Sequence, residues 1–284
     1  VVMVRRLLLA NDLPGVGKVA LATSIPLAAA CQVETMLLPT VLLSSHTGGF
    51  PDVVSQELTD LNRAYLGQWK KLNLEVAGIL SGYCRSPQQL SQLAIYAKEI
   101  ETPLIVDPIM GDNGRLYSGF TPSYVEAMKE LAQSATLILP NLTEAALLTG
   151  RDYLGDFYDI QDIEDLIKSL AEQVSADIVL TGITFGDRQI GVAYFQQETG
   201  EITTYTSHKY QAQFFGTGDI LSTLLAIATI ENISLHPAIP LALDFIDKSL
   251  KQTLSLNRDL QLGIYFEPFL AELQEAFQKL KEKV

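Results

Sequence analysis

Residues 214–219 read F-F-G-T-G-D and are followed at once by I-L-S-T-L-L-A-I-A-T-I, an apolar run with helical spacing. Two glycines flank a threonine where this helix is predicted to begin. Several backbone N–H groups and the positive end of the helix dipole would therefore surround one small volume, which suits an anion. The next side chain is the carboxylate of Asp219. A carboxylate would normally repel a phosphate group, so its presence beside an anion site requires a chemical reason.

This motif allows two interpretations. In the first, Asp219 accepts a proton from a hydroxyl group while the amides of Gly216, Thr217 and Gly218 hold the charge on a transferring phosphoryl group. In the second, the motif is a glycine-rich turn whose aspartate complements the helix dipole. The motif alone does not separate them, so the rest of the chain has to.

The composition indicates a globular protein, and we expect one domain over residues 1–284. The chain has 284 residues, is 48% hydrophobic and carries a net charge of −13, which argues against general binding of nucleic acid or of an anionic membrane. It has two cysteines without a C-x-x-C pair and three histidines, so we expect neither a disulfide framework nor a zinc site. The first residues read as a strand rather than a signal peptide, and we expect a cytoplasmic enzyme.

Short apolar runs alternate with helical patterns along most of the chain. The predicted strands are 4–10, 35–38, 75–80, 103–106, 135–139 and 177–181, and the predicted helices between them are 16–32, 56–72, 87–100, 122–134 and 160–174. We expect a turn at 11–15 and an antiparallel hairpin over 188–206. Such alternation predicts an α/β fold with a mostly parallel sheet covered on both faces, whose ligand contacts follow the carboxyl ends of the strands.

Oxygen-bearing side chains follow two of these strands. Asn141 and Glu144 come after 135–139 at a spacing of three, and Asp107 and Asp112 follow 103–106. Mg²⁺ bridging the phosphates of ATP would use such ligands. For Asn141 and Glu144 the alternative is a helix cap, with Asn141 or Thr143 as the N-cap residue. Four oxygen-bearing side chains exceed what a cap requires, so a metal–nucleotide site is the better interpretation.

The sequence G-V-G-K at 15–18 invites comparison with a phosphate-binding P-loop. That pattern requires a glycine at position 12 and a serine or threonine at position 19, where this chain has Asp12 and Val19. A dinucleotide-binding loop would match only weakly, because Ala20 replaces the third glycine, so hydride transfer is a distant alternative. Lys18 could contact phosphate or be a solvated lysine at a helix start.

Two other loops carry candidate substrate contacts. Thr47 lies in the loop after the second strand and could hydrogen-bond a heteroatom of a small ring, while we expect His46 to orient this loop. Tyr83 ends another strand, where its ring could stack on a flat substrate or could be structural.

Taken together, these motifs resemble those of a known family. F-F-G-T-G-D resembles the anion-hole and base motif of the ribokinase-like superfamily of ATP-dependent small-molecule kinases. P-T-V-L-L-S-S-H-T-G, S-G-Y, D-P-I-M-G-D-N-G-R-L-Y and P-N-L-T-E are similar to motifs of the pyridoxal kinases within it. The matches run in family order from about residue 39 to residue 219. The resemblance implies a three-layer α/β/α sandwich, transfer of the γ-phosphoryl group of ATP to the 5′-hydroxymethyl group of a B6 vitamer, and a homodimer.

The resemblance also implies a role for each matching residue. Asp219 would be the base, with the amides of Gly216, Thr217 and Gly218 as the anion hole. The substrate would be bound by Asn11, Thr47, Tyr83 and Asp219, and ATP with its cation by Asp107, Asp112, Asn141, Glu144 and Thr181. Of these, Asp107, Asp112 and Glu144 would be the Mg²⁺ ligands, and a monovalent cation such as K⁺ would be a further cofactor.

The chain departs from the family in two places, and alternatives stay open. N-D-L-P-G at 11–15 replaces the family's Q-S-x-V pattern, and Gly182 follows Thr181 where many relatives have serine. Hydroxymethylpyrimidine kinase is the nearest alternative enzyme, and a vitamin or nucleotide sensor without turnover is the alternative outside enzymes.

Overall fold

The structure, a computed structural model, describes residues 4–283, which form two compact units. Unit 1 contains residues 4–82 together with 210–283, and unit 2 is Tyr83–Lys209. Each unit is an α/β structure, and each is described here by itself. The single domain over 1–284 stays a prediction.

Unit 1 is built on four strands in the order β4-β1-β2-β3. β1 is parallel to both β2 and β4, and β3 is antiparallel to β2. The strands are β1 (Arg6–Pro14), β2 (Glu34–Leu43), β3 (Ser55–Glu57) and β4 (Gly78–Ser81). The helices are α1 (Ala20–Ala30), α2 (Thr59–Leu72), α7 (Thr217–Ile230), α8 (Leu235–Ser255) and α9 (Leu270–Lys281), with 3-10 turns η1 (Leu260–Leu262) and η2 (Glu267–Phe269).

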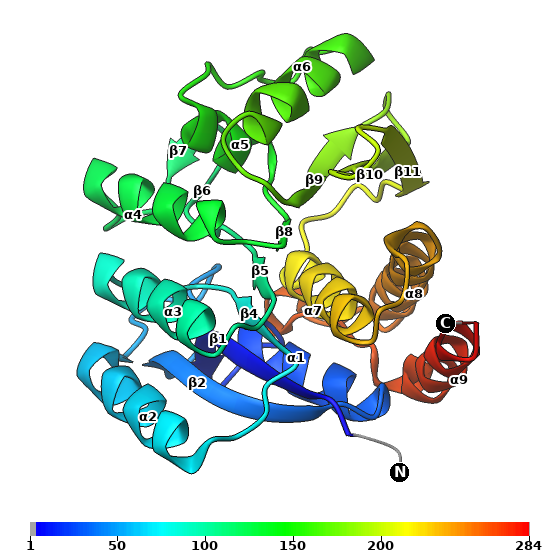
Figure 1. The fold of residues 1–284 in the computed structure, drawn as a ribbon. Coiled ribbons are helices and arrows are strands. Elements are labelled where there is room, and N and C mark those ends of the chain that lie inside the picture. Colours follow the sequence, from blue (N-terminus) through cyan, green and yellow to red (C-terminus); the bar gives the residue numbers. More distant parts are fainter. Residues whose placement is uncertain (1–3, 284) are drawn as a thin grey trace. The chain divides into compact units, whose positions relative to one another are not determined.

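The core of unit 1 joins β1 to α7. Leu7, Leu8 and Leu9 of β1 are at most 1% exposed, as expected for a strand covered on both faces. α7 is apolar on nearly all sides and packs on α1 and α8, while α2 lies on the other side of the β1–β2 pair (Figure 1). Each leucine buried in this way stabilises the fold by about 1.5–3 kcal/mol. The start of α7, with the F-F-G-T-G-D motif, is therefore fixed to the most buried part of unit 1.

Unit 2 carries five strands in the order β11-β10-β9-β8-β5 and a separate two-stranded hairpin, β6-β7. β5, β8 and β9 are parallel, and β10 and β11 add the antiparallel hairpin that the sequence predicts. The strands are β5 (Leu104–Val106), β6 (Gly111–Asp112), β7 (Arg115–Leu116), β8 (Leu137–Ile138), β9 (Asp177–Thr184), β10 (Gln189–Phe195) and β11 (Ile202–His208). The helices are α3 (Pro87–Glu99), α4 (Pro122–Gln133), α5 (Leu142–Thr149) and α6 (Ile160–Ala171).

Three strands are longer than the sequence predicts. β1 continues through the expected turn to Pro14, because Leu13 and Pro14 pair with Leu42 and Leu43 of a longer β2. β9 passes Thr181 and ends at Thr184, where it pairs with β10. Polar and glycine residues suggested a turn at 11–15 and loops after the other two strands, but pairing with a neighbouring strand keeps the backbone extended. Within residues 4–283, no helix combines the length and hydrophobicity needed to cross a membrane.

Candidate active site

The F-F-G-T-G-D loop forms the N-terminus of α7. Gly216 is the N-cap residue with φ 95°, and a Cβ there would lie 2.6 Å from the carbonyl oxygen of Lys18, so both conformation and space require glycine. No side chain caps this helix start. The first N–H groups of α7 are therefore available to a ligand, in the arrangement that favours an anion.

Asp219 lies in the first turn of α7, and its carboxylate accepts hydrogen bonds from the backbone N–H of Ala20 and from Nδ2 of Asn11, the latter at 3.4 Å. Burial raises the pKa of Asp219, and these two donors oppose the shift. A carboxylate with a raised pKa is a better proton acceptor near neutral pH.

Asn11 has a fixed orientation. Its Oδ1 accepts the backbone N–H of Asp12 at 3.0 Å, so its amide group is directed at Asp219. Gly82 makes room for it, since a Cβ at Gly82 would lie 2.3 Å from Nδ2 of Asn11. Asn11, which we expected to contact the substrate, thus holds the carboxylate of Asp219.

The loop with Thr47 is held by His46, as expected. The backbone N–H of Gly48 donates to Nδ1 of His46 at 3.0 Å, and Nε2 of His46 donates to the carbonyl oxygen of Gln261 at 2.5 Å. The ring also packs against Phe215, with ring centroids 5.0 Å apart. His46 therefore joins the exposed Thr47 to the F-F-G-T-G-D loop.

The G-V-G-K sequence makes structural contacts in this same region. Gly17 has φ 97°, and a Cβ on it would lie 2.2 Å from Cδ2 of His46, so glycine is needed for the histidine to pack there. Lys18 forms an ion pair with Glu267, and its ammonium lies 5.1 Å from the centroid of the Tyr265 ring. Lys18 therefore has a structural partner in unit 1.

In unit 2, Asn141 and Glu144 form a capping box at the start of α5. Oδ1 of Asn141 accepts the N–H of Glu144 at 2.9 Å, and Oε2 of Glu144 accepts the N–H of Asn141 at 2.8 Å. The capping alternative is therefore present, with Asn141 and not Thr143 as the N-cap residue. Oε1 of Glu144 also accepts the N–H of Met110 at 3.3 Å, which ties α5 to the loop after β5.

The carboxylates expected to bind a metal lie around this cap. Glu144 is 3% exposed, and its pKa is raised well above the ordinary value by burial and by the charge of Asp107, with a smaller effect from Asp112. Among residues 4–283, no group of three or more His, Cys, Asp or Glu side chains has metal-site spacing. These side chains nevertheless carry the oxygen ligands that Mg²⁺ takes, and a cation beside them would relieve the repulsion that raises the pKa of Glu144.

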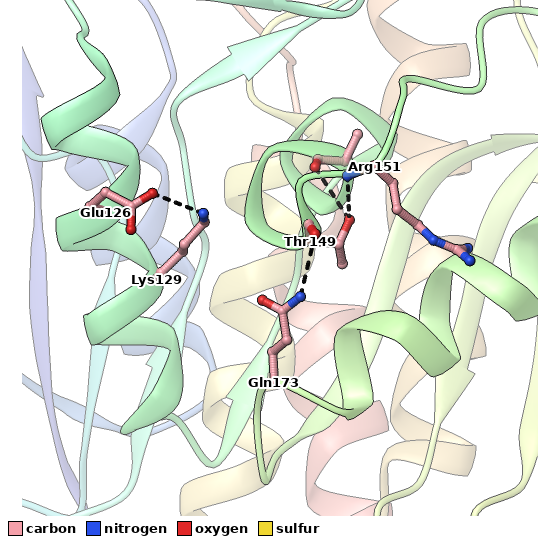
Figure 2. A network of polar contacts seen from close by, with 6 residues as sticks. Glu126, Lys129, Thr149, Arg151 and Gln173 are labelled. Carbon is pink, nitrogen blue, oxygen red and sulfur yellow. Dashed lines mark hydrogen bonds and ion pairs between the residues drawn. The ribbon is translucent and has the colours of Figure 1, made fainter.

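The other end of α5 is fixed as well (Figure 2). The hydroxyl of Thr149 donates to the carbonyl oxygen of Ala145 at 2.7 Å, and the carbonyl oxygen of Thr149 accepts from Nε2 of Gln173 at 3.4 Å. Near the start of α5, Thr181 of β9 donates its backbone N–H to the carbonyl oxygen of Pro140 at 2.8 Å. Thr181 is thereby placed next to Asn141.

Tyr83 lies half-buried at the edge of unit 2. Its hydroxyl accepts a hydrogen bond from Nη1 of Arg85 at 3.0 Å, and its ring lies 5.7 Å from that of Phe120. Phe120 in turn stacks on Tyr124 at 4.0 Å. The ring is supported by other aromatic side chains, which fits either of the two roles considered for it.

The structure groups the predicted residues by unit. Unit 1 brings together Asn11, Asp219 and residues 216–218, with the Thr47 loop attached through His46. Unit 2 brings together Asp107, Asp112, Asn141, Glu144 and Thr181. Asp12, a buried carboxylate beside Asn11, was not predicted from the sequence. Its burial follows from the pairing of β1 with β2, which no local pattern shows.

Comparison with known proteins identifies the family. The phosphomethylpyrimidine kinase family matches residues 28–262, most of the chain. The solved structure of pyridoxal kinase from Lactobacillus plantarum is 32% identical, with 99% of each chain covered and a TM-score of 0.89. This chain belongs to the phosphomethylpyrimidine kinase family. The kinase class, the pyridoxal kinase resemblance and the ribokinase-like fold predicted from the sequence are thereby confirmed.

Two further relatives extend the match. A structure from Bacteroides thetaiotaomicron, provisionally named a phosphomethylpyrimidine kinase and crystallised with pyridoxal, is 28% identical with a TM-score of 0.89, covering 95% of this chain and 96% of that one. Pyridoxal kinase from Arabidopsis thaliana is 28% identical over 195 residues, which is 65% of this chain. The matched part spans 61% of the length of the Arabidopsis enzyme.

Proposed function

We propose that this protein transfers the γ-phosphoryl group of ATP to the 5′-hydroxymethyl group of pyridoxal, pyridoxine or pyridoxamine. The observation that carries the proposal is the start of α7, where uncapped N–H groups adjoin the half-buried carboxylate of Asp219. Hydroxyl activation and phosphate binding need these two features side by side. The match to the pyridoxal kinase structure from Lactobacillus plantarum, over 99% of this chain, supports the choice of acceptor.

Unit 1 supplies the groups that act on the acceptor and on the transferred group. Asp219 accepts the hydroxyl proton, while Asn11 and the N–H of Ala20 hold its carboxylate in one orientation. The N–H groups at residues 216–218 stabilise the charge on the phosphoryl oxygens. Thr47, on the loop that His46 fixes, is the ring contact proposed for unit 1, and Tyr83 is the ring contact proposed for unit 2. Because the transition state is loose, positioning and charge stabilisation matter more than a strong base.

Unit 2 supplies the groups that hold the nucleotide and its cation. Asp107, Asp112 and Glu144 would supply oxygen ligands for Mg²⁺, Asn141 orients Glu144, and Thr181 would contact an ATP phosphate. Mg²⁺ bound there would neutralise phosphate charge and orient the γ-phosphoryl group. We include K⁺ as an activating ion because the family resemblance implies it, and replacing K⁺ with Na⁺ in the assay tests this.

The test is release of ADP from Mg-ATP with a panel of acceptors: the three B6 vitamers, hydroxymethylpyrimidine, ribose and adenosine. We expect turnover with the vitamers. Turnover with hydroxymethylpyrimidine alone would agree with the fold and the mechanism but contradict the proposed substrate. Hydroxymethylpyrimidine is the second candidate substrate because the matching family is described as phosphomethylpyrimidine kinase. ATP binding without turnover on any acceptor would favour the sensor.

We also propose a cytoplasmic homodimer. A cytoplasmic location suits an ATP-dependent enzyme whose two cysteines, Cys31 and Cys84, are buried thiols and form no disulfide. Exposed apolar side chains in unit 1 on β2, α2 and the loop before β3, namely Leu42, Val54, Leu61 and Tyr65, support self-association. Light scattering that gives the mass of a single chain at assay concentration would contradict the dimer.

A further inference from the structure

Two buried hydroxyl groups join α1 to α7 in unit 1. Oγ of Ser24 and Oγ1 of Thr223 lie 2.8 Å apart, and the two residues are 2% and 0% exposed. Oγ of Ser24 also donates to the carbonyl oxygen of Ala20 at 3.1 Å. Because a serine hydroxyl has one proton to donate, the proton between the two hydroxyl groups comes from Thr223. An apolar pair of the same shape would hold two helices together about as well, so the hydroxyl pair calls for an explanation.

The hydrogen bonds of this pair lead back to Asp219. Ala20, whose carbonyl oxygen accepts from Ser24, donates its own N–H to the carboxylate of Asp219. Thr223 lies one turn after Asp219 along α7. The contacts therefore run from Thr223 through Ser24 and Ala20 to Asp219, and they end on the helix where they begin.

Ala20 is held in a strained conformation at the start of α1. Its φ is 50°, in the left-handed region that residues other than glycine seldom adopt. The N-cap residue of α1 is Val19, whose side chain cannot accept a hydrogen bond, and the first turn has no acidic residue. The carboxylate of Asp219 thus takes the place of a cap for α1. A strained residue keeps its conformation where its surroundings fix it, and the hydroxyl of Ser24 fixes Ala20 through its carbonyl oxygen.

The backbone just before Ala20 lies close to the start of α7. A Cβ at Gly216 would lie 2.6 Å from the carbonyl oxygen of Lys18 and 3.6 Å from Cγ1 of Val19. Two helix starts therefore meet around the carboxylate of Asp219. A small displacement of α1 along α7 would change the distance between the N–H of Ala20 and this carboxylate, and the hydroxyl pair is the polar contact that resists it.

We propose that Ser24 and Thr223 are positioning residues for the proposed base, because their hydroxyl pair holds the N–H of Ala20 against the carboxylate of Asp219. This N–H donates to the charged form of the carboxylate and so keeps it able to accept a proton. Burial raises the pKa of Asp219, and the hydrogen bond from Ala20 opposes that shift. The inference rests on the proposed function, in which Asp219 accepts the proton of the substrate hydroxyl.

The test is the pH profile of kcat for Thr223→Val, which keeps the shape of the side chain and removes the hydroxyl, and for Ser24→Ala. A weaker hydrogen bond from Ala20 would raise the pKa of Asp219, so the acid limb of the profile should move to higher pH. On that limb we expect both variants to be roughly 3- to 10-fold slower than wild type, the size of one hydrogen bond, with KM for the vitamer unchanged. The double variant should be no slower than the slower single variant, because both substitutions break the same chain of contacts.

Two control variants separate positioning from a general effect on the core. Thr223→Ser keeps the hydroxyl and should keep the wild-type profile. Thr23→Val removes the neighbouring hydroxyl of α1, which is equally buried and has no hydrogen-bond partner among residues 4–283, so it should leave the acid limb in place. A wild-type acid limb in both Thr223→Val and Ser24→Ala, or an equal shift in Thr23→Val, would overturn the inference.

A second readout needs no turnover. The pKa of Asp219 can be followed by carbon-13 NMR of its carboxyl group in the protein without substrates, with the signal assigned by its loss in Asp219→Asn. We expect this pKa to rise in Thr223→Val and Ser24→Ala and to stay at the wild-type value in Thr23→Val. A raised pKa in a protein that turns over no acceptor would support the positioning of Asp219 and count against the proposed function. An unchanged pKa in an active enzyme would overturn the inference alone.

Discussion

Asp219 in unit 1 and Glu144 in unit 2 occupy similar places, since each lies in the first turn of a helix and each has a raised pKa caused first by burial. Their partners differ. Both oxygens of Glu144 accept backbone N–H groups, from Asn141 and Met110. Asp219 accepts one backbone N–H and one long bond of 3.4 Å from Asn11, and the helix start beside it has no side-chain cap.

The difference shows how hydrogen-bond partners can give two similar carboxylates different roles. Glu144 is held by its hydrogen bonds and surrounded by further acidic side chains, which suits a fixed ligand for a cation. Asp219 is less fully bonded and so retains capacity to accept a proton. The predictions below test this division, beginning with the largest expected effect.

Asp219→Asn removes the proton acceptor and keeps the size of the side chain. We expect kcat to fall by about 10²- to 10⁴-fold, because general base catalysis contributes that much, while ATP and the vitamer still bind. Coupled ADP release and calorimetric titration measure the two properties. A variant within a few-fold of the wild-type rate would remove Asp219 from the chemistry.

Glu144→Gln keeps the capping box, in which glutamine also serves, and removes the charge. We expect the Mg²⁺ concentration for half-maximal rate to rise by roughly 10- to 100-fold, with little loss of stability. Asp162→Asn is the matched control, because Asp162 closes a second capping box, on the exposed start of α6 in the same unit. If both variants had the same Mg²⁺ requirement as wild type, Glu144 would be structural only.

The two glycines of the anion hole should differ in stability. Gly216→Ala places a Cβ 2.6 Å from the carbonyl oxygen of Lys18 at φ 95°, and we expect it to lower the free energy of unfolding by about 1–3 kcal/mol. A Cβ at Gly218 meets nothing within 4 Å, so Gly218→Ala should change stability by no more than about 1 kcal/mol. Urea denaturation measures both. Equal losses would mean that the strained backbone at Gly216 does not matter.

Most of the fold and many groupings within the site could be predicted from the sequence. Alternating apolar runs located the parallel strands, and the spacing of Asn141 and Glu144 placed them together at a helix start. The family resemblance identified the kinase class, because it rests on several motifs in order along the chain.

The remaining features depend on contacts between distant segments. The polar sequence N-D-L-P-G predicted a turn, but pairing with β2 extends β1 through it to Pro14. The role of Lys18 could not be assigned from the sequence, because its ion-pair partner Glu267 lies 249 residues away along the chain. The burial of Asp12 also follows from that pairing, so no local pattern could reveal it.

The most direct test of the account is the single-turnover rate of phosphoryl transfer to pyridoxal over a range of Mg²⁺ concentrations, for wild type, Asp219→Asn and Glu144→Gln. The account predicts that Glu144→Gln approaches the wild-type rate as Mg²⁺ rises. It predicts that Asp219→Asn stays slow at every Mg²⁺ concentration. Recovery of Asp219→Asn by Mg²⁺, with Glu144→Gln remaining slow, would contradict the division of tasks between the two carboxylates.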